Sequence, residues 1–146
     1  MDNIASFLGL ILRAGRLAVG EEPVLAACMG HKASLLLLAQ DAADNTIRRA
    51  SHYSETGNAL CLTLPMNKVQ LGEALGRASC AVVAVTEIGF ASALTEKLAQ
   101  LDPTSFHDAH EMLRKKAQRA KKRKSPQYAR AKAERRSLRQ NSDNKK

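Results

Sequence analysis

The central stretch of the sequence is Ser34-Leu35-Leu36-Leu37-Leu38-Ala39-Gln40. An unbroken apolar run of this length, without polar alternation, indicates a strand that is buried on both faces. Such a strand needs helices above and below its sheet, because water reaches neither side of it. Residues 34–40 therefore predict the inner strand of a sheet in an α/β protein.

The segments around this strand predict alternating helices and strands. Apolar spacing and capping signals predict helices at 3–14, 20–30, 44–56, 67–75 and 88–101, and short apolar runs predict strands at 16–19, 59–64 and 80–86. This order predicts a three-layer αβα sandwich, with helices on both faces of a mostly parallel sheet. We expect residues 1–101 to form this domain and residues 102–146 to form an extension.

Local signals place several helix ends. Gly15 is expected to stop the first helix, and Gln70, three residues after Asn67, predicts a capping box. Asp44 or Asn45 is expected to cap the third helix, and Asn58 is part of its expected exit. These signals support the predicted order of helices and strands independently of the apolar spacing.

Charge divides the chain into two unlike parts. Residues 1–100 carry 8 Lys and Arg against 9 Asp and Glu, a net charge of −1, whereas residues 101–146 carry 15 against 5, a net charge of +10. A near-neutral body with a strongly basic extension is typical of a folded module with an arm for a polyanion. RNA, DNA and anionic lipid are the candidate polyanions.

The extension is expected to be disordered or partly helical. Residues 107–124 have a helix-favouring composition, but their large apolar residues are only Met112 and Leu113, so a helix there would have little to bury. Its like charges also oppose packing in the unbound state. The expected phosphate contacts of this tail are Arg114, Lys115, Lys116, Arg119, Lys121, Lys122, Arg123 and Lys124.

The sequence contains none of the common short motifs of enzyme sites. It lacks a G-x-G-x-x-G string, a P-loop, a C-x-x-C pair and a G-x-S-x-G elbow. His107 and His110 have no third ligand nearby, so a solvated helix start is favoured over a metal site. An inert buried thiol is favoured over a nucleophile at Cys80, because its surroundings are apolar. We expect a non-enzymatic protein without metal, cofactor or small-molecule substrate.

Composition also indicates where the chain works. No apolar run reaches membrane-spanning length, and the N-terminus lacks the basic start and cleavage site of a secretory signal. The three cysteines are widely spaced in apolar surroundings, as expected of reduced thiols in a reducing compartment. We expect a cytoplasmic monomer that does not bind membranes.

Glu21 and Glu22, at the start of the helix after Gly20, allow three interpretations. They complement the helix dipole, they act as general acid and base, or they accept hydrogen bonds from the base edges of a nucleic acid. Catalysis is the least favoured, because no polarising partner is evident in the sequence. In the third interpretation, the flanking cations Arg13, Arg16 and Lys32 would hold the nucleic-acid backbone.

An ordered set of short strings resembles the bacterial branch of the ribosomal protein L seven Ae / L thirty e superfamily. The strings are Phe7-Leu8-Gly9-Leu10, Arg13-Ala14-Gly15-Arg16-Leu17, Gly20-Glu21-Glu22, Lys32-Ala33-Ser34-Leu35-Leu36-Leu37-Leu38-Ala39, Asp41-Ala42, Asn45-Thr46, Leu71-Gly72-Glu73-Ala74-Leu75-Gly76, Ala81-Val82-Val83-Ala84-Val85-Thr86 and Gly89-Phe90-Ala91. The resemblance covers about residues 3–100 and implies the same sandwich fold.

The resemblance also implies a way of binding RNA. Proteins of this family insert the start of the second helix, here at Gly20, into a kink-turn, a sharp bend flanked by sheared G·A pairs. The family's Asn, Glu and Lys contact positions correspond to Glu22, Pro23 and Ala26, which depart from the pattern. The family's second contact loop maps to residues 77–79 and implies contacts by Arg77 and Ser79.

The sequence thus predicts an RNA-binding protein whose partner is ribosomal RNA, in the ribosome or apart from it, or another structured RNA. Its body would recognise shape and its tail would supply affinity. If the tail contacts about six phosphates, binding should weaken on the order of 10³-fold between low and moderate salt. The alternative is a ribosome-assembly or protein-interaction adaptor whose tail alone binds nucleic acid without specificity.

Overall fold

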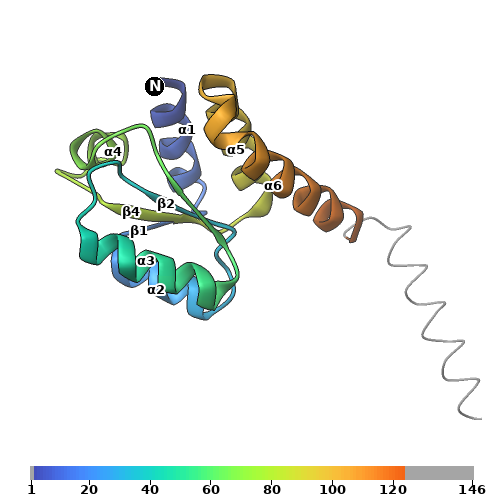
Figure 1. Ribbon diagram of the computed structural model, residues 1–146, viewed down its shortest axis with the longest axis horizontal. Helices are drawn as coiled ribbons and strands as arrows, with labels where there is room; N and C mark the ends of the chain where they lie inside the picture. The colour runs from blue at the N-terminus through green and yellow to red at the C-terminus, as the bar shows by residue number, and fades with distance from the viewer. Residues whose placement is uncertain (1, 124–146) are drawn as a thin grey trace, which may run out of the picture.

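The computed structural model describes residues 2–123, which form six helices and four strands (Figure 1). The helices are α1 (Asp2–Arg13), α2 (Glu21–Met29), α3 (Asp44–Gly57), α4 (Lys68–Ala74), α5 (Ile88–Leu101) and α6 (Pro103–Arg123). The strands are β1 (Leu17–Val19), β2 (Leu35–Leu38), β3 (Leu60–Thr63) and β4 (Val82–Val85).

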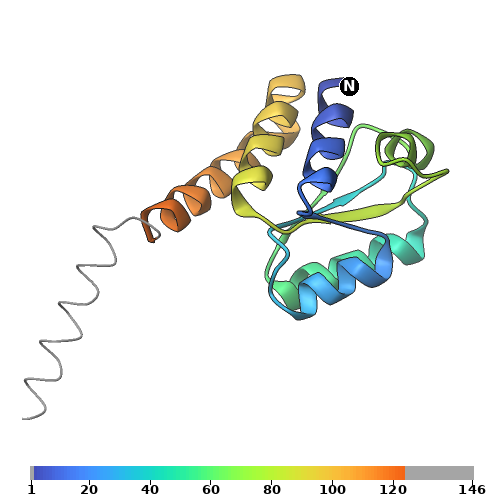
Figure 2. The same ribbon diagram turned by 180° about the vertical axis from the view of Figure 1, so that it is seen from behind.

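The sheet lies between two layers of helices, which confirms the three-layer αβα sandwich. The strand order is β1-β4-β2-β3, and every residue of the inner strands β2 and β4 is buried. One core, on the side of α1, α4, α5 and α6, includes Leu8, Leu35 and Leu94. The other core, on the side of α2 and α3, includes Val24 and Leu36. Figure 2 shows α2 and α3 on one face of the sheet and α1 and α5 on the other.

The expectation of a mostly parallel sheet is wrong. Only β2 and β3 are parallel, whereas β4 runs antiparallel to both β1 and β2. A parallel β4 would need a connection that returns along the sheet. The connection from β3 to β4 through α4 instead stays at one end of the strands. The residues on either side of α4 meet there, since the Cys80 N–H donates to the Lys68 carbonyl at 2.9 Å.

Most local predictions of helix ends are confirmed. Asn67 and Gln70 form a reciprocal capping box, with hydrogen bonds of 2.8 and 2.9 Å, and Asn58 ends α3 in the left-handed conformation at φ 52°. Neither Asp44 nor Asn45 caps α3. The N-cap is Ala43 and α3 begins at Asp44, so Asp44 lies in the first turn, where its charge suits the helix dipole.

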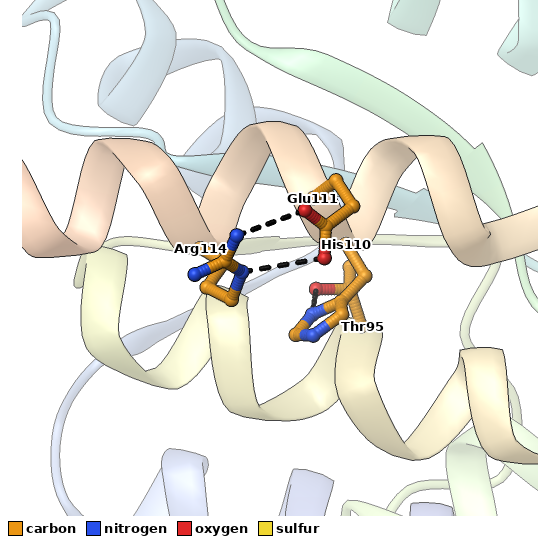
Figure 3. A network of polar contacts seen from close by, with 4 residues as sticks. All are labelled: Thr95, His110, Glu111 and Arg114. Carbon is orange, nitrogen blue, oxygen red and sulfur yellow. Dashed lines mark hydrogen bonds and ion pairs between the residues drawn. The ribbon is translucent and has the colours of Figure 1, made fainter.

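The expectation that the helix in the extension has little to bury is also wrong. Helix α6 packs along α5, and Phe106, Ala109 and Leu113 are buried beneath it, while Met112 is exposed. The helix begins at Pro103, earlier than expected, and this adds Phe106 to its inner face at the helical spacing 106, 109, 113. The buried Thr95 of α5 contacts His110 of α6, with 3.4 Å between Oγ1 and Nδ1 (Figure 3).

Candidate functional site

Gly20 turns the chain sharply from β1 into α2. Its dihedral angles, φ 94° and ψ 166°, lie in a region that is essentially restricted to glycine. Its N–H donates to the Val82 carbonyl at the start of β4, at 3.1 Å, and its carbonyl accepts from the Val24 N–H. No side chain caps α2. The turn therefore fixes the helix start against the sheet and leaves the first-turn N–H groups of α2 without a side-chain cap.

The two carboxylates of the first turn have different surroundings. Glu21 accepts hydrogen bonds from Arg49 of α3, the shorter at 2.8 Å, and this contact raises the pKa of the guanidinium. Glu22 is exposed and forms no ion pair with any side chain from residue 3 to residue 122. Glu22 is therefore the carboxylate that is available to an outside donor. Arg49 escaped the sequence analysis because it lies 28 residues from Glu21 and no local pattern links them.

The loop before β4 lies at the same end of the sheet as Gly20. Arg77 and Ser79, both exposed, precede Cys80, whose thiol is close enough to Arg77 and to the Gly20 backbone for both to lower its pKa. Burial raises the pKa of Cys80 and outweighs these two effects and that of the hydrogen bond from the thiol to the Val82 carbonyl. The loop with Arg77 and Ser79 therefore lies at the same end of the sheet as Gly20, from which Glu21 and Glu22 begin α2.

The flanking cations lie at the other end of the sheet. The Thr86 N–H donates to the Arg16 carbonyl and the Ser34 N–H to the Val85 carbonyl, so the start of β1, the start of β2 and the end of β4 meet there. Helix α2, nine residues long, separates this end from Gly20 by about 13 Å. Arg16 and Lys32 therefore do not flank the start of α2, although they are close to it in sequence.

A pocket of about 520 Å³ lies at this second end. Its lining residues are Arg16, His31, Lys32, Ser34, Thr86, Glu87 and Ile88. Glu87 caps α5, since its carboxylate accepts from the N–H groups of Gly89 and Phe90 at 2.9 and 2.8 Å. Arg13 lies close by along the chain, exposed at the end of α1. Sequence reasoning missed His31 and Thr86, because their proximity depends on strand directions that no local pattern specifies.

The second half of α6 contains most of the basic residues that are expected to contact phosphates. Seven of its residues between 114 and 123 are Lys or Arg, and none is acidic. Arg114 pairs with Glu111 at 2.9 Å, which lowers the pKa of that carboxyl (Figure 3). Lys115, Arg119, Lys121 and Lys122 are exposed and Lys116 is half-buried, while the Arg123 side chain and all of Lys124 lie outside the described part of the chain.

The cysteines fit the expectation of inert thiols. Cys28 and Cys80 are buried and Cys61 is half-buried. Burial raises the pKa of all three thiols, that of Cys61 to about 11. Since the thiolate is the nucleophile, a raised pKa lowers the reactivity of a thiol.

Residues 2–123 contain no cluster of three or more His, Cys, Asp or Glu side chains that could hold a metal ion. Within the same range, no helix has both the length and the apolar character needed to span a membrane.

Comparison with known proteins gives sequence relatives and a structural neighbour. The chain is 35% identical over 95 residues to the RNA-binding protein YlxQ of Bacillus subtilis, a match that covers 62% of this chain and 90% of the relative. It is 29% identical over 91 residues to the RNA-binding protein YlxQ of Enterococcus faecium, covering 62% of this chain and 86% of that relative.

A solved structure of a protein of unknown function from Bacillus halodurans superposes with a TM-score of 0.59 at 29% identity. That match covers 64% of this chain and 93% of the neighbour. No protein-family model matches the chain. The sequence match to the Bacillus subtilis protein spans nearly the whole relative, and on this ground the chain belongs to the family of the RNA-binding protein YlxQ.

Proposed function

We propose that this chain is a non-enzymatic RNA-binding protein that recognises a kink-turn or a similarly bent RNA through the start of α2. Family membership supports RNA as the partner, since both curated relatives carry RNA binding in their names. The resemblance to the ribosomal L seven Ae / L thirty e superfamily supports a bent RNA as the form recognised, with ribosomal RNA as one candidate.

The proposal rests on the juxtaposition of the α2 start and the loop at 77–79. An uncapped helix start offers N–H donors and a positive dipole end to phosphate or base acceptors. The exposed Glu22 carboxylate can accept hydrogen bonds from guanine donors, and Arg77 and Ser79 lie at the same end of the sheet. This combination suits an RNA that exposes base edges and backbone together at a bend.

The fold argues against reading bases by stacking on the sheet. Helices cover both faces of the sheet, whereas stacking platforms need an open face with aromatic side chains. Phe106 is buried, and Phe7 packs edge-on against Phe90 with 6.0 Å between the ring centroids. Recognition by a helix start and a loop is the arrangement that remains for the described residues.

A binding comparison tests the proposal. Full-length protein is titrated at fixed salt with a kink-turn RNA and with a straight duplex of equal length. The Kd for the duplex divided by the Kd for the kink-turn RNA measures shape selectivity. Glu22→Ala should reduce this ratio by roughly 5- to 150-fold, the range of one good base-edge contact of about 1–3 kcal/mol. Its affinity for the straight duplex should not fall, because the substitution removes a negative charge.

Glu55→Ala is the matched control. Glu55 is an exposed carboxylate of α3 with no side-chain partner in residues 2–123, so its loss changes the net charge equally. This control should retain the wild-type selectivity. If the unaltered protein binds both RNAs equally and with a steep salt dependence, the α2 start does not read RNA. The adaptor with a non-specific tail then becomes the better description.

A further inference from the structure

The end of the sheet away from Gly20 carries the cations Arg13, Arg16 and Lys32, whereas Arg49 and Arg77 lie at the Gly20 end. Arg16, His31 and Lys32 line the pocket there, and Arg13 ends α1 beside it. Neither Arg16 nor Lys32 forms an ion pair with a side chain of residues 3–122. The pocket wall holds one carboxylate, Glu87, against the two cations Arg16 and Lys32, so the pocket has a net positive charge. Glu87 is also engaged as the cap of α5, where it accepts two N–H donors.

The basic half of α6 extends toward this same end. Helices α5 and α6 are antiparallel, and Thr95 lies opposite His110. Ile88, in the pocket wall, is seven residues before Thr95, so it is about level with Ala117, seven residues after His110. Residues 114–123 therefore begin beside the first turn of α5 and continue beyond it. Figure 1 shows this half of α6 projecting from the end of the molecule where α5 begins.

We propose that the pocket and the basic half of α6 form a second RNA-contacting surface, which binds the phosphate backbone of a stem independently of the α2 start. The surface offers Arg16, Lys32 and the exposed Lys115 and Arg119 of α6. The pocket has no Phe, Tyr or Trp side chain, and its one carboxylate, Glu87, is already engaged with two N–H groups of α5, so the surface suits backbone rather than base recognition. The inference rests on the proposed RNA-binding function.

The division of labour follows from charge. Near Gly20, an RNA meets the free carboxylate of Glu22, which repels phosphates and suits a base edge. At the pocket end it meets cations that suit phosphates but cannot distinguish sequences. One RNA with a bend and a flanking stem would contact both ends, whereas a straight duplex would contact only the pocket and α6.

Nuclear magnetic resonance on ¹⁵N-labelled full-length protein tests this arrangement. A straight RNA duplex should shift the amide signals of Arg16, Lys32 and residues 114–123 and leave those of Gly20–Glu22 in place. A kink-turn RNA with the same stem should shift both groups. The second surface is rejected if neither RNA shifts Arg16 and Lys32, even where α6 responds.

The two proposals fail in different ways. If the kink-turn RNA shifts the pocket and α6 but leaves Gly20–Glu22 and the loop at 77–79 unshifted, the proposed kink-turn recognition fails while the second surface stands. Shifts confined to Gly20–Glu22 and that loop would overturn the second surface and leave the recognition proposal intact.

Salt dependence gives a second, independent measurement. On the straight duplex, the double variant Arg16→Gln/Lys32→Gln should lower the slope of log Kd against log salt concentration by about two, since each phosphate contact contributes about 0.9. Arg48→Gln is the control for loss of a cation elsewhere, because Arg48 is an exposed residue of α3 outside the pocket. An unchanged slope in the double variant would exclude phosphate binding in the pocket.

Discussion

Gly72 allows the second candidate contact loop to pass directly over α4. A β-carbon at residue 72 would lie 2.6 Å from the Cα of Ser79 and 2.9 Å from the carbonyl oxygen of Arg77. Both are backbone atoms, which cannot move aside as a flexible side chain would. The Arg77 N–H also donates to the Gly72 carbonyl at 2.8 Å, so the loop is held against the helix at this point.

Gly72→Ala should therefore destabilise the fold by roughly 1–3 kcal/mol, the usual cost of overpacking, and displace the loop. Gly9→Ala is the matched control within another helix, α1. Its β-carbon would lie at an ordinary 3.4 Å from the Ala74 carbonyl, and replacing a helical glycine gains about 0.5–1 kcal/mol. Chemical denaturation of both variants should give effects of opposite sign. If the two variants were equally stable, the loop at 77–79 would be able to move away from residue 72 without loss of stability.

At the scale of elements, α6 combines a docked half and a basic half. Leu113 is fully buried against α5, whereas its neighbour Met112 is 47% exposed. Leu113→Ala should cost about 2–5 kcal/mol, since it removes buried methyl groups and leaves a cavity. Met112→Ala should change stability by less than about 0.5 kcal/mol, because it lies on the solvent face. Urea denaturation of the two variants measures the difference, and similar losses would contradict this packing of α6.

What the sequence could predict was largely local. Apolar runs and capping signals are encoded within one element, so the buried strand at 34–40 and the Asn67–Gln70 cap were predicted correctly. A local signal for the start of α6 was also present. Asp102 followed by Pro103 suits a helix start, and the Asp102 carboxylate accepts a hydrogen bond from Ser105 N–H at 3.3 Å. A helix that begins at this signal, at Pro103 rather than at residue 107, includes Phe106.

Strand directions and the grouping of the site residues could not be predicted in the same way. Arg16 and Lys32 flank the α2 start in sequence, but β1 separates Arg16 from that start and α2 separates Lys32 from it. The Glu21–Arg49 pair joins residues 28 positions apart and leaves no periodic trace. Such contacts depend on how the elements pack, which is a property of the whole chain.

At the scale of the molecule, the part of the extension that forms α6 belongs to the folded domain, because α6 contributes to the core. Phe106 and Leu113 pack into the same core as Leu94 and Leu98 of α5. A chain that ends after residue 101 would expose this face of α5, while a chain that ends after residue 123 would keep it covered. Burial of the two large side chains of α6 contributes roughly 1.5–3 kcal/mol each, part of which offsets the ordering of the helix.

The chain ending at residue 101 should therefore melt at least about 10 °C below the chain ending at 123, since 1 kcal/mol shifts the Tm of a domain of this size by about 4–8 °C. The chain ending at 123 should keep α6 packed on α5. In RNA titrations it should also retain a large part of the salt dependence, because 7 of the 15 basic residues after position 100 lie between 114 and 123. Equal melting temperatures for the two truncated chains would place the boundary of the stable domain at residue 101 and make α6 an appendage.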